Sequence, residues 1–409
     1  MIVVSRGDIV LPDRVLTEGT ILIDAGRIVA VESRPVDLTR ATMIDATDCY
    51  VVPGFIDVHV HGIEGYDTLD GADAVAQIAS RLTRYGVTAF CPTTVACPPD
   101  DLRTFLLQVQ RSRVEPATGG ARVLPAHLES NFISPEYRGA QPASCLRTPI
   151  SRGDDDVYSG RDVLDVIAAS RPDVGIVTLA PELPGAIDLV KTLVAAGHRV
   201  SIGHSGADFD TAVAAIDAGA RHATHLFNRM TPIAHRAPGI AGAVLAREEV
   251  SAELICDGYH VHPGMCRVAI AAKGADGIFA ITDGTAGSGM PIGATARLGG
   301  QTIHVRNEAA FLDDGTLAGS TLTMDRAFRA IVTSFGGSLV DGATMCATTP
   351  ARELGLTGFG VIAEGAVADL VVLDRGFQVV RTLIAGEEVW GQSGVRSGSG
   401  RGQVGVRPQ

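Results

Sequence analysis

The feature that most constrains this chain is a regular alternation of short apolar segments with amphipathic ones between residues 50 and 355. Eight apolar segments have the length and composition of buried strands, and segments with helical spacing separate several of them. The predicted strands are 50–59, 87–93, 122–128, 175–180, 199–203, 222–227, 251–256 and 277–282, and the predicted helices are 72–85, 100–111, 162–169, 186–196 and 208–218. Eight βα repeats predict an α/β fold with a closed (β/α)8 TIM-like barrel, whose functional residues lie at the C-terminal ends of the strands.

The two ends of the chain have a different pattern. Alternating apolar and polar residues, separated by glycine-containing turns, predict short antiparallel strands at the N-terminus, and a similar pattern returns at 368–390. We therefore expect a small β-sandwich domain built from residues 1–48 and 360–390, and a barrel domain over 49–359. The segment 391–409 is rich in Gly, Ser and Arg and is predicted to be a disordered tail.

Charge and composition argue against several classes of protein. The net charge is −12 and lysine occurs only at Lys191 and Lys273, so we expect no binding to nucleic acid or to an anionic membrane surface. The sequence contains no apolar run long enough for a membrane span and no signal-peptide pattern. The seven cysteines are scattered and form no CxxC pair, which is typical of reduced thiols and predicts a cytoplasmic protein.

Side chains that can bind a metal follow five of the predicted strands. His59 and His61 end the first strand, and their spacing places both imidazoles on the same side of an extended chain. The others are Glu129, His204, His225 and Asp283, after the third, fifth, sixth and eighth strands. Any one of them alone is more simply explained as a hydrogen-bonded structural residue. Six together at one end of a barrel predict a site for zinc or a similar divalent ion.

The motifs PGFIDVHVHG, HLE, GHS, THLFN and TDG, followed by LAGSTLTMDRA, resemble the amidohydrolase superfamily and, within it, the N-acetylglucosamine-6-phosphate deacetylase family. The resemblance covers most of the chain, including the two-part β domain. It implies a metal-dependent hydrolase that removes the acetyl group from an N-acetylated amino sugar, N-acetylglucosamine 6-phosphate in particular. Many superfamily members bridge two metals with a carboxylated lysine, whereas here the resemblance gives this place to Glu129.

The same resemblance implies roles for the residues at the strand ends. Glu129, His204 and His225 would hold the principal metal, with zinc favoured, and His59 and His61 would help to hold a second, giving one or two ions per subunit. Asp283 is placed to act as general base and then to protonate the leaving amine. His260, in the DGYH motif, is a candidate donor to the oxyanion that forms during the reaction.

Substrate contacts are implied at Asn228, at Arg236 and in the segment Leu317, Ala318 and Gly319. In relatives, the arginine that matches Arg236 reaches the neighbouring subunit's site, which implies a homodimer. The sequence departs from the family pattern in three places: Ser130 and Asn131 replace Gly-Pro after the metal ligand, Ala140-Gln141 stands where the family has Ala-His, and Arg229 replaces a small residue. These departures leave open which acylated sugar is used and whether it must carry a phosphate.

Two other interpretations remain. The chain could be an amidohydrolase that acts on a different N-acyl or cyclic amide substrate, although those enzymes usually carry a bridging Lys or a Cys in place of Glu129. It could also be a non-catalytic barrel, but such a protein is expected to have lost metal ligands, and this chain has all of them.

Overall fold

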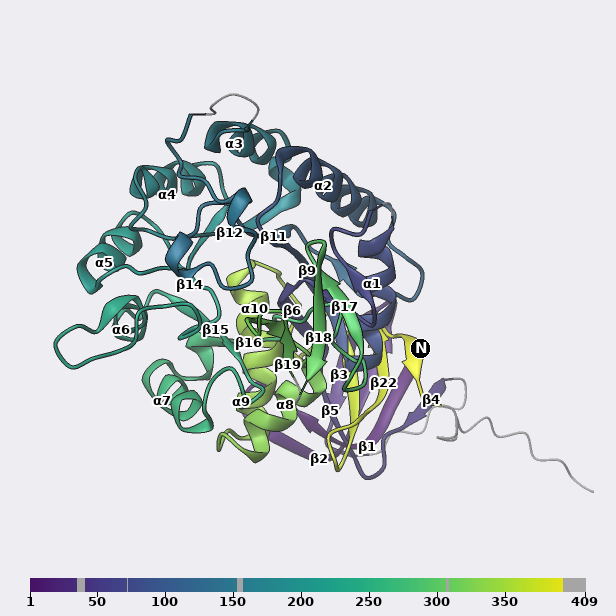
Figure 1. The fold of residues 1–409 in the computed structure, drawn as a ribbon. Helices are drawn as coiled ribbons and strands as arrows, with labels where there is room; N and C mark the ends of the chain where they lie inside the picture. Colours follow the sequence, from purple (N-terminus) through teal and green to yellow (C-terminus); the bar gives the residue numbers. More distant parts are fainter. Residues whose placement is uncertain (35–40, 72, 153–156, 307–308, 393–409) are drawn as a thin grey trace, which may run out of the picture.

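The computed structural model describes residues 1–34, 41–71, 73–152, 157–306 and 309–392. Eight parallel strands form a barrel around its centre (Figure 1). In order, they are β6 (Phe55–Val60), β9 (Val87–Thr94), β11 (Ala126–Glu129), β12 (Val174–Leu179), β13 (Arg199–Ile202), β14 (His222–Ala223), β15 (Ser251–Ile255) and β16 (Ile278–Ile281), and the short β10 (Arg122–Val123) also pairs with β9. The first and last strands meet where the amide of Asp283 donates to the carbonyl of His59 at 3.0 Å. The predicted barrel is confirmed.

The barrel strands are apolar along most of their length because both of their faces are covered. Every residue of β9 and of β16 is buried, which is the pattern expected for a parallel sheet enclosed by helices. The helices surround the strands in Figure 1 and confirm the five predicted ones to within a few residues. The five predicted helices correspond to α1 (Ala74–Leu82), α2 (Pro99–Val114), α3 (Gly160–Ala169), α4 (Ala186–Ala195) and α5 (Phe209–Asp217). The others are α6 (Gly239–Ala246), α7 (Pro263–Lys273), α8 (Met324–Thr333), α9 (Leu339–Ala343) and α10 (Thr349–Glu353).

The two ends of the chain come together in one sheet, which confirms the predicted association of both termini in a separate β domain. Its strand order is β23-β22-β21-β5-β1-β2-β3, with β4 paired to β1. The strands are β1 (Ile2–Val10), β2 (Val15–Asp24), β3 (Arg27–Glu32), β4 (Thr42–Asp45), β5 (Cys49–Pro53), β21 (Leu370–Asp374), β22 (Val379–Ile384) and β23 (Glu387–Gly391). Beyond Gly391 and Gln392, the predicted disordered tail lies outside the described residues.

The prediction of a single strand at 50–59 is wrong. Its first part, β5, pairs with β1 and β21 in the terminal sheet, and only its second part, β6, belongs to the barrel. The chain crosses from one sheet to the other at Gly54, where a Cβ atom would lie 2.3 Å from the hydroxyl of Thr88. A continuous apolar run conceals this crossing because both strands are buried.

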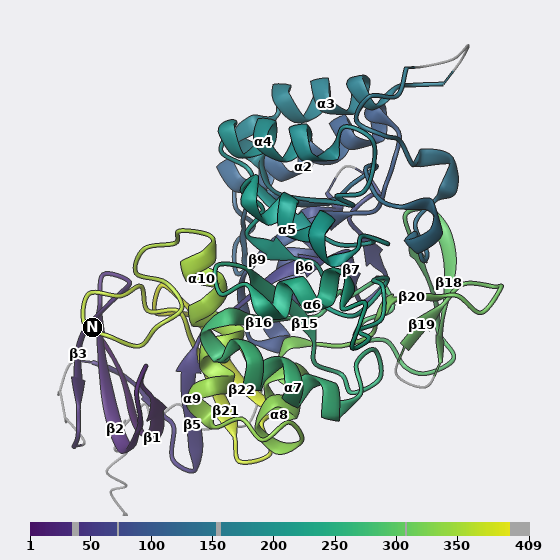
Figure 2. The same cartoon turned by 90° about the vertical axis from the view of Figure 1, so that its left-hand side faces the viewer.

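A four-stranded antiparallel sheet between β16 and α8 was not predicted. It consists of β17 (Thr295–Leu298), β18 (Gln301–Arg306), β19 (Ala309–Phe311) and β20 (Leu317–Ser320). Figure 2 shows it on the opposite side of the barrel from the terminal sheet. The short strands β7 (Gly62–Ile63) and β8 (Tyr66–Asp67) form a further hairpin. Among the described residues, no helix is long and apolar enough to cross a membrane.

Candidate active site

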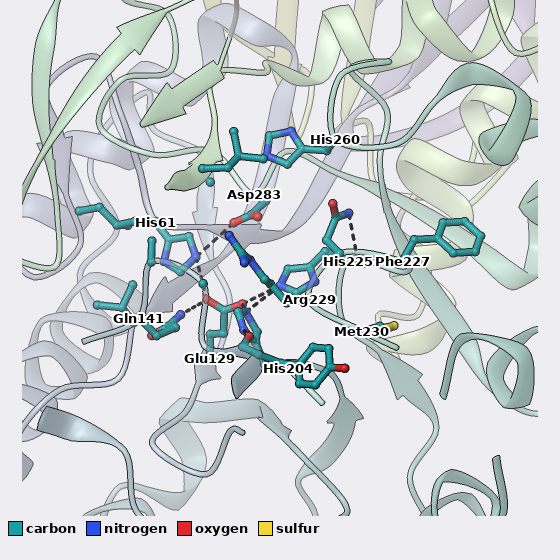
Figure 3. A pocket seen from close by; sticks show the side chains of 18 of the residues that line it. His61, Glu129, Gln141, His204, His225, Phe227, Arg229, Met230, His260 and Asp283 are labelled. Atoms are coloured by element: carbon teal, nitrogen blue, oxygen red, sulfur yellow. Dashed lines mark hydrogen bonds and ion pairs between the residues drawn. The ribbon is translucent and has the colours of Figure 1, made fainter. Parts of the chain in front are cut away.

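The six side chains at the strand ends lie together at one mouth of the barrel, and Figure 3 shows five of them: His61, Glu129, His204, His225 and Asp283. Each lies at or just beyond the C-terminal end of a strand, where a TIM-like barrel carries its functional groups. The residues are His59 and His61 from β6 and the position after it, Glu129 at the end of β11, and His204, His225 and Asp283 after β13, β14 and β16. All six are buried, yet five of them line a cavity: His61, Glu129, His204, His225 and Asp283.

Glu129 lies at the centre of the group. Its Oε1 is 2.8 Å from Nε2 of His204 and 2.9 Å from Nε2 of His225, and these two nitrogens are 3.0 Å apart. Its Oε2 faces Nε2 of His61 at 3.4 Å. Oε1 also lies 3.9 Å from Nε2 of His59, so the one carboxylate lies between both pairs of imidazoles.

Asp283 closes the other side of the group. Its Oδ1 is 3.4 Å from Nε2 of His59 and 3.3 Å from Nε2 of His61, and the two imidazole nitrogens are 3.1 Å apart. Two sets of three donors, Glu129 with His204 and His225 and Glu129 with His59 and His61, are each close enough to hold one ion.

The chemistry of these donors fits a cation. Nδ1 of His204 lies 2.7 Å from the carbonyl of Tyr137, which can only accept a hydrogen bond, so that nitrogen carries the proton. If the ring is neutral, Nε2 presents a lone pair toward the Glu129 carboxylate at 2.8 Å, and this repulsion is relieved either by a proton on Nε2 or by a cation between the two atoms. Nitrogen ligands at the usual zinc distance of about 2.1 Å lie roughly 3.3 Å apart in a tetrahedral site, close to the spacings seen here.

The pKa shifts of Glu129 and His61 also indicate a site that suits a cation. Burial alone would raise the pKa of Glu129, but His204 and His225 hold it well below its usual range. Burial would lower the pKa of His61, but hydrogen bonds with Asp283 and Glu129 outweigh it and raise that pKa to about 10. Without a metal, a proton on His61 compensates the carboxylates. A bound divalent ion would displace that proton.

Three of these residues have strained backbones. His204, His225 and Asp283 have φ of 47°, 30° and 48°, in a region that residues other than glycine seldom occupy. Each follows directly on a barrel strand, so the turn that directs the side chain inward adopts this conformation. Such strain persists only where the surrounding structure holds it, and it is concentrated at functional sites.

The cavity above the group has a volume of about 420 Å³, within the range of small-molecule sites. Asn228 and His260 line it, as the resemblance implies, and so does Arg229, one of the departures from the family pattern. Nδ1 of His260 is 2.6 Å from the carboxylate of Asp257, so its other ring nitrogen is left for the cavity. The exposed Arg229 has no carboxylate partner among the residues that the structure describes.

The three departures from the family pattern have different positions. Ser130 and Asn131 are buried, do not line the cavity, and bond to main-chain carbonyls; for example, Ser130 Oγ donates to Thr178 at 2.6 Å. Gln141 lines the cavity, but its amide donates to Oε2 of Glu129 and its carbonyl accepts from the amide of Ala96 at 2.7 Å. Both ends of the Gln141 amide are thus bonded within the protein.

The remaining predicted substrate contacts divide in the same way. Leu317, Gly319 and Ala140 line the cavity, whereas Ala318 is fully buried in the core of the β17–β20 sheet. Arg236 is exposed on the loop before α6 and is not among the residues that line the cavity. Arg236 therefore does not form part of the cavity wall in its own chain.

Sequence reasoning missed two residues that bear on the site. Tyr137 lines the cavity and its carbonyl orients His204, but an aromatic residue in a loop carries no signal of such a role. Glu253 lies in the middle of β15 with no exposed surface and contacts His59. A carboxylate within the apolar segment SAELI is a signal that could have identified it.

Comparisons with known proteins agree with this geometry. The amidohydrolase family matches residues 50–389. The chain is 37% identical over 347 residues to N-acetylglucosamine-6-phosphate deacetylase of Lysinibacillus sphaericus, covering 84% of this chain and 86% of the relative. The structure of the deacetylase of that name from Thermotoga maritima matches with a TM-score of 0.84 and 33% identity, covering 96% of this chain and 100% of the other.

A variant of the Mycobacterium smegmatis deacetylase, determined in complex with N-acetyl-D-glucosamine 6-phosphate, matches with a TM-score of 0.85 and 32% identity over 95% of this chain and 99% of the other. Family, fold and the residues at the strand ends agree along nearly the whole chain. The chain therefore belongs to the amidohydrolase family.

Proposed function

We propose that this protein is a metal-dependent deacetylase that hydrolyses the amide of an N-acetylated amino sugar, N-acetylglucosamine 6-phosphate in particular, to acetate and the free amine. The observation that carries the proposal is the placement of Glu129 between two sets of imidazoles, with Asp283 facing it across the floor of a sugar-sized cavity. The activity of the relatives that share nearly the whole length of the chain supports the substrate.

Glu129, His204 and His225 would hold the principal ion, and His59 and His61 would help to hold another, with Glu129 common to both sets. Zinc is the ion that we favour, because imidazole and carboxylate ligands in a compact group suit it. When bound, such an ion polarises a carbonyl and makes water a stronger acid. Since the Gln141 amide already donates to Oε2 of Glu129, a second ion would compete with that hydrogen bond.

Asp283 and His260 supply the remaining chemistry. Burial would raise the pKa of Asp283, but His59 and His61 lower it below its usual value, so the carboxylate is ionised at neutral pH and can accept a proton from the attacking water. It then gives this proton to the amide nitrogen, which leaves as an amine. The cavity-facing nitrogen of His260, when protonated, donates to the oxygen on which negative charge develops.

Arg229 and Asn228 would bind the phosphate and sugar. An arginine without a carboxylate partner at the mouth of a cavity suits an anion, because its planar group can donate two parallel hydrogen bonds to phosphate. Arg236 would reach the same phosphate only from the neighbouring subunit, and we therefore propose a homodimer. The seven cysteines, which form no disulfide, support a location in the cytoplasm.

The proposal is tested by acetate release from N-acetylglucosamine 6-phosphate, unphosphorylated N-acetylglucosamine and an N-acetyl-D-amino acid, with zinc-loaded protein. We expect kcat/KM to be highest for the phosphorylated sugar by roughly ten- to a hundredfold, since the unphosphorylated sugar loses a charge-assisted contact with Arg229. A preference for the N-acetyl-D-amino acid would favour the alternative, an amidohydrolase that acts on a different N-acyl substrate. No acetate from any of the three, with metal bound, would contradict the proposed substrate class.

A further inference from the structure

A carboxylate lies inside the barrel beneath the candidate metal site. Glu253 is the central residue of β15 and has no exposed surface. Its Oε2 is 2.9 Å from Nδ1 of His59 and accepts the main-chain N–H of His225 at 3.2 Å. The same side chain therefore contacts one residue from each set of candidate metal ligands.

The other neighbours of Glu253 bind it less closely. Nδ1 of His127 is 3.7 Å from its Oε1, but that nitrogen lies 3.0 Å from the carbonyl of Val58, and the other ring nitrogen lies 2.8 Å from the hydroxyl of Thr178. Oε1 has no hydrogen-bond partner among the described residues. The close contacts of the carboxylate are those that lead to the metal site.

The four imidazoles differ in what holds them. Nδ1 of His204 contacts a main-chain carbonyl, and Nδ1 of His59 contacts Glu253. The Nδ1 atoms of His61 and His225 are buried and have no hydrogen-bond partner in the part of the chain that the structure describes. Each set of ligands thus contains one imidazole oriented by an acceptor behind it. For the set with His59, this acceptor is a carboxylate.

We propose that Glu253 is a positioning residue of the metal centre, which holds the Nδ1–H of His59 so that Nε2 is free to bind an ion. The inference rests on the proposed function only in that it requires a metal at this site. A histidine ligand is oriented and made more basic when its second nitrogen donates to a carboxylate. The bond to the His225 amide also stabilises the strained turn that carries His225.

A purely structural role explains these contacts poorly. An ionised carboxylate in a barrel interior is costly, and an apolar side chain of similar volume would fill the same space more favourably. A carboxylate at position 253 has a function if the imidazole of His59 must keep its proton on Nδ1. In Glu253→Gln, the oxygen that accepts the His225 amide can still accept from Nδ1 of His59, but it carries no charge, so His59 loses the carboxylate that makes its Nε2 a stronger metal ligand.

The test is titration of metal-free protein with Co²⁺, followed by its visible absorption and by calorimetry, in wild type and Glu253→Gln. We expect binding by the set that contains His59 to be ten- to a hundredfold weaker in the variant, with a changed Co²⁺ spectrum, on the scale typical for lost carboxylate support of a ligand. In zinc-loaded protein, kcat should fall while KM stays within about twofold.

Glu353→Gln is the matched control, because Glu353 pairs with His222 at 3.4 Å, away from the metal site. It should bind Co²⁺ as wild type does. Unchanged Co²⁺ affinity and spectrum in Glu253→Gln would overturn the proposal, as would equal losses in both variants. If Glu253→Gln does not fold, Glu253→Asp keeps the charge but shortens its reach, and it should show the same weakened binding. Normal Co²⁺ binding by a wild type without deacetylase activity would contradict only the proposed substrate.

Discussion

At the scale of single residues, Asp283 combines two properties that a general base requires. It contacts the imidazoles of His59 and His61, which keep it ionised, and it also lines the cavity where substrate would lie. The backbone at this position is strained, with φ of 48°, so the surrounding turn fixes the direction of the side chain.

Asp283→Asn is therefore expected to leave the fold and the metal content unchanged while reducing kcat by at least about a hundredfold, the usual effect of losing a general base. Acetate release and the metal-to-protein ratio are measured on the same sample. Turnover within about threefold of wild type, with metal bound, would remove Asp283 from this role.

Arg229 tests the binding of the phosphate. In Arg229→Met, kcat/KM for N-acetylglucosamine 6-phosphate should fall roughly ten- to a hundredfold, because a charge-assisted hydrogen bond is worth about 1.5–3 kcal/mol. The low rate on the unphosphorylated sugar should not change. Arg267→Met, at an exposed site on α7, is the control and should behave as wild type. An equal loss on both sugars in Arg229→Met would show that Arg229 does not recognise phosphate.

At the scale of elements, the β17–β20 sheet forms one wall of the cavity and packs against the backbone of Asp283. Gly319, in β20, has φ of 58°, and a Cβ atom there would lie 2.9 Å from the carbonyl oxygen of Asp283. Gly315, in the turn before β20, has φ of 84° and open space around it. The two glycines share the same kind of backbone and differ in what surrounds them.

Both Gly319→Ala and Gly315→Ala should lower the free energy of unfolding by about 1–2 kcal/mol, the cost of a Cβ in a left-handed conformation. Only Gly319→Ala should also reduce kcat, by roughly tenfold or more, because it displaces the backbone of Asp283. Urea unfolding and acetate release separate the two effects. Equal kcat values for the two variants would contradict the role of β20 in positioning Asp283.

The contact between α10 and β14 predicts a pH dependence. Burial would raise the pKa of Glu353, but its interactions with His222 and Arg352 lower it to about 2, below its ordinary value of 4.5. Because the folded pKa is depressed, this contribution to stability is present above pH 4.5 and is lost as the pH falls toward 2.

Glu353→Gln should accordingly lower the free energy of unfolding at pH 7 by up to about 3 kcal/mol, at 1.36 kcal/mol per pKa unit. The difference from wild type should shrink as the pH is lowered from 5 to 3, measured by urea unfolding at each pH. A difference that stays constant with pH would show that the carboxylate charge contributes nothing.

At the scale of the whole molecule, the barrel could be predicted because its strands are buried on both faces and are therefore apolar throughout. The residues that converge at its mouth could be predicted because each ends a strand. The crossing at Gly54 could not, since β5 and β6 have the same apolar character. The β17–β20 sheet was missed because its strands are short and partly exposed, as in β17 and β18.

Side-chain contacts between separate segments of the chain could not be predicted from the sequence either. Gln141 returns to Glu129 through a loop, and only the folded structure shows that its amide bonds to that carboxylate and not into open space. The contact between Glu253 and His59 joins residues 194 positions apart. The sequence shows which polar residues are present, but only the folded chain shows which of them are partners.

The measurement that tests the central claim most directly is a zinc titration of metal-free protein, with acetate release from N-acetylglucosamine 6-phosphate followed at each addition. We expect no turnover without metal and a rise that saturates at one or two ions per chain, since two overlapping sets of ligands share Glu129. Full turnover in metal-free protein, or no acetate once zinc is bound, would contradict this expectation.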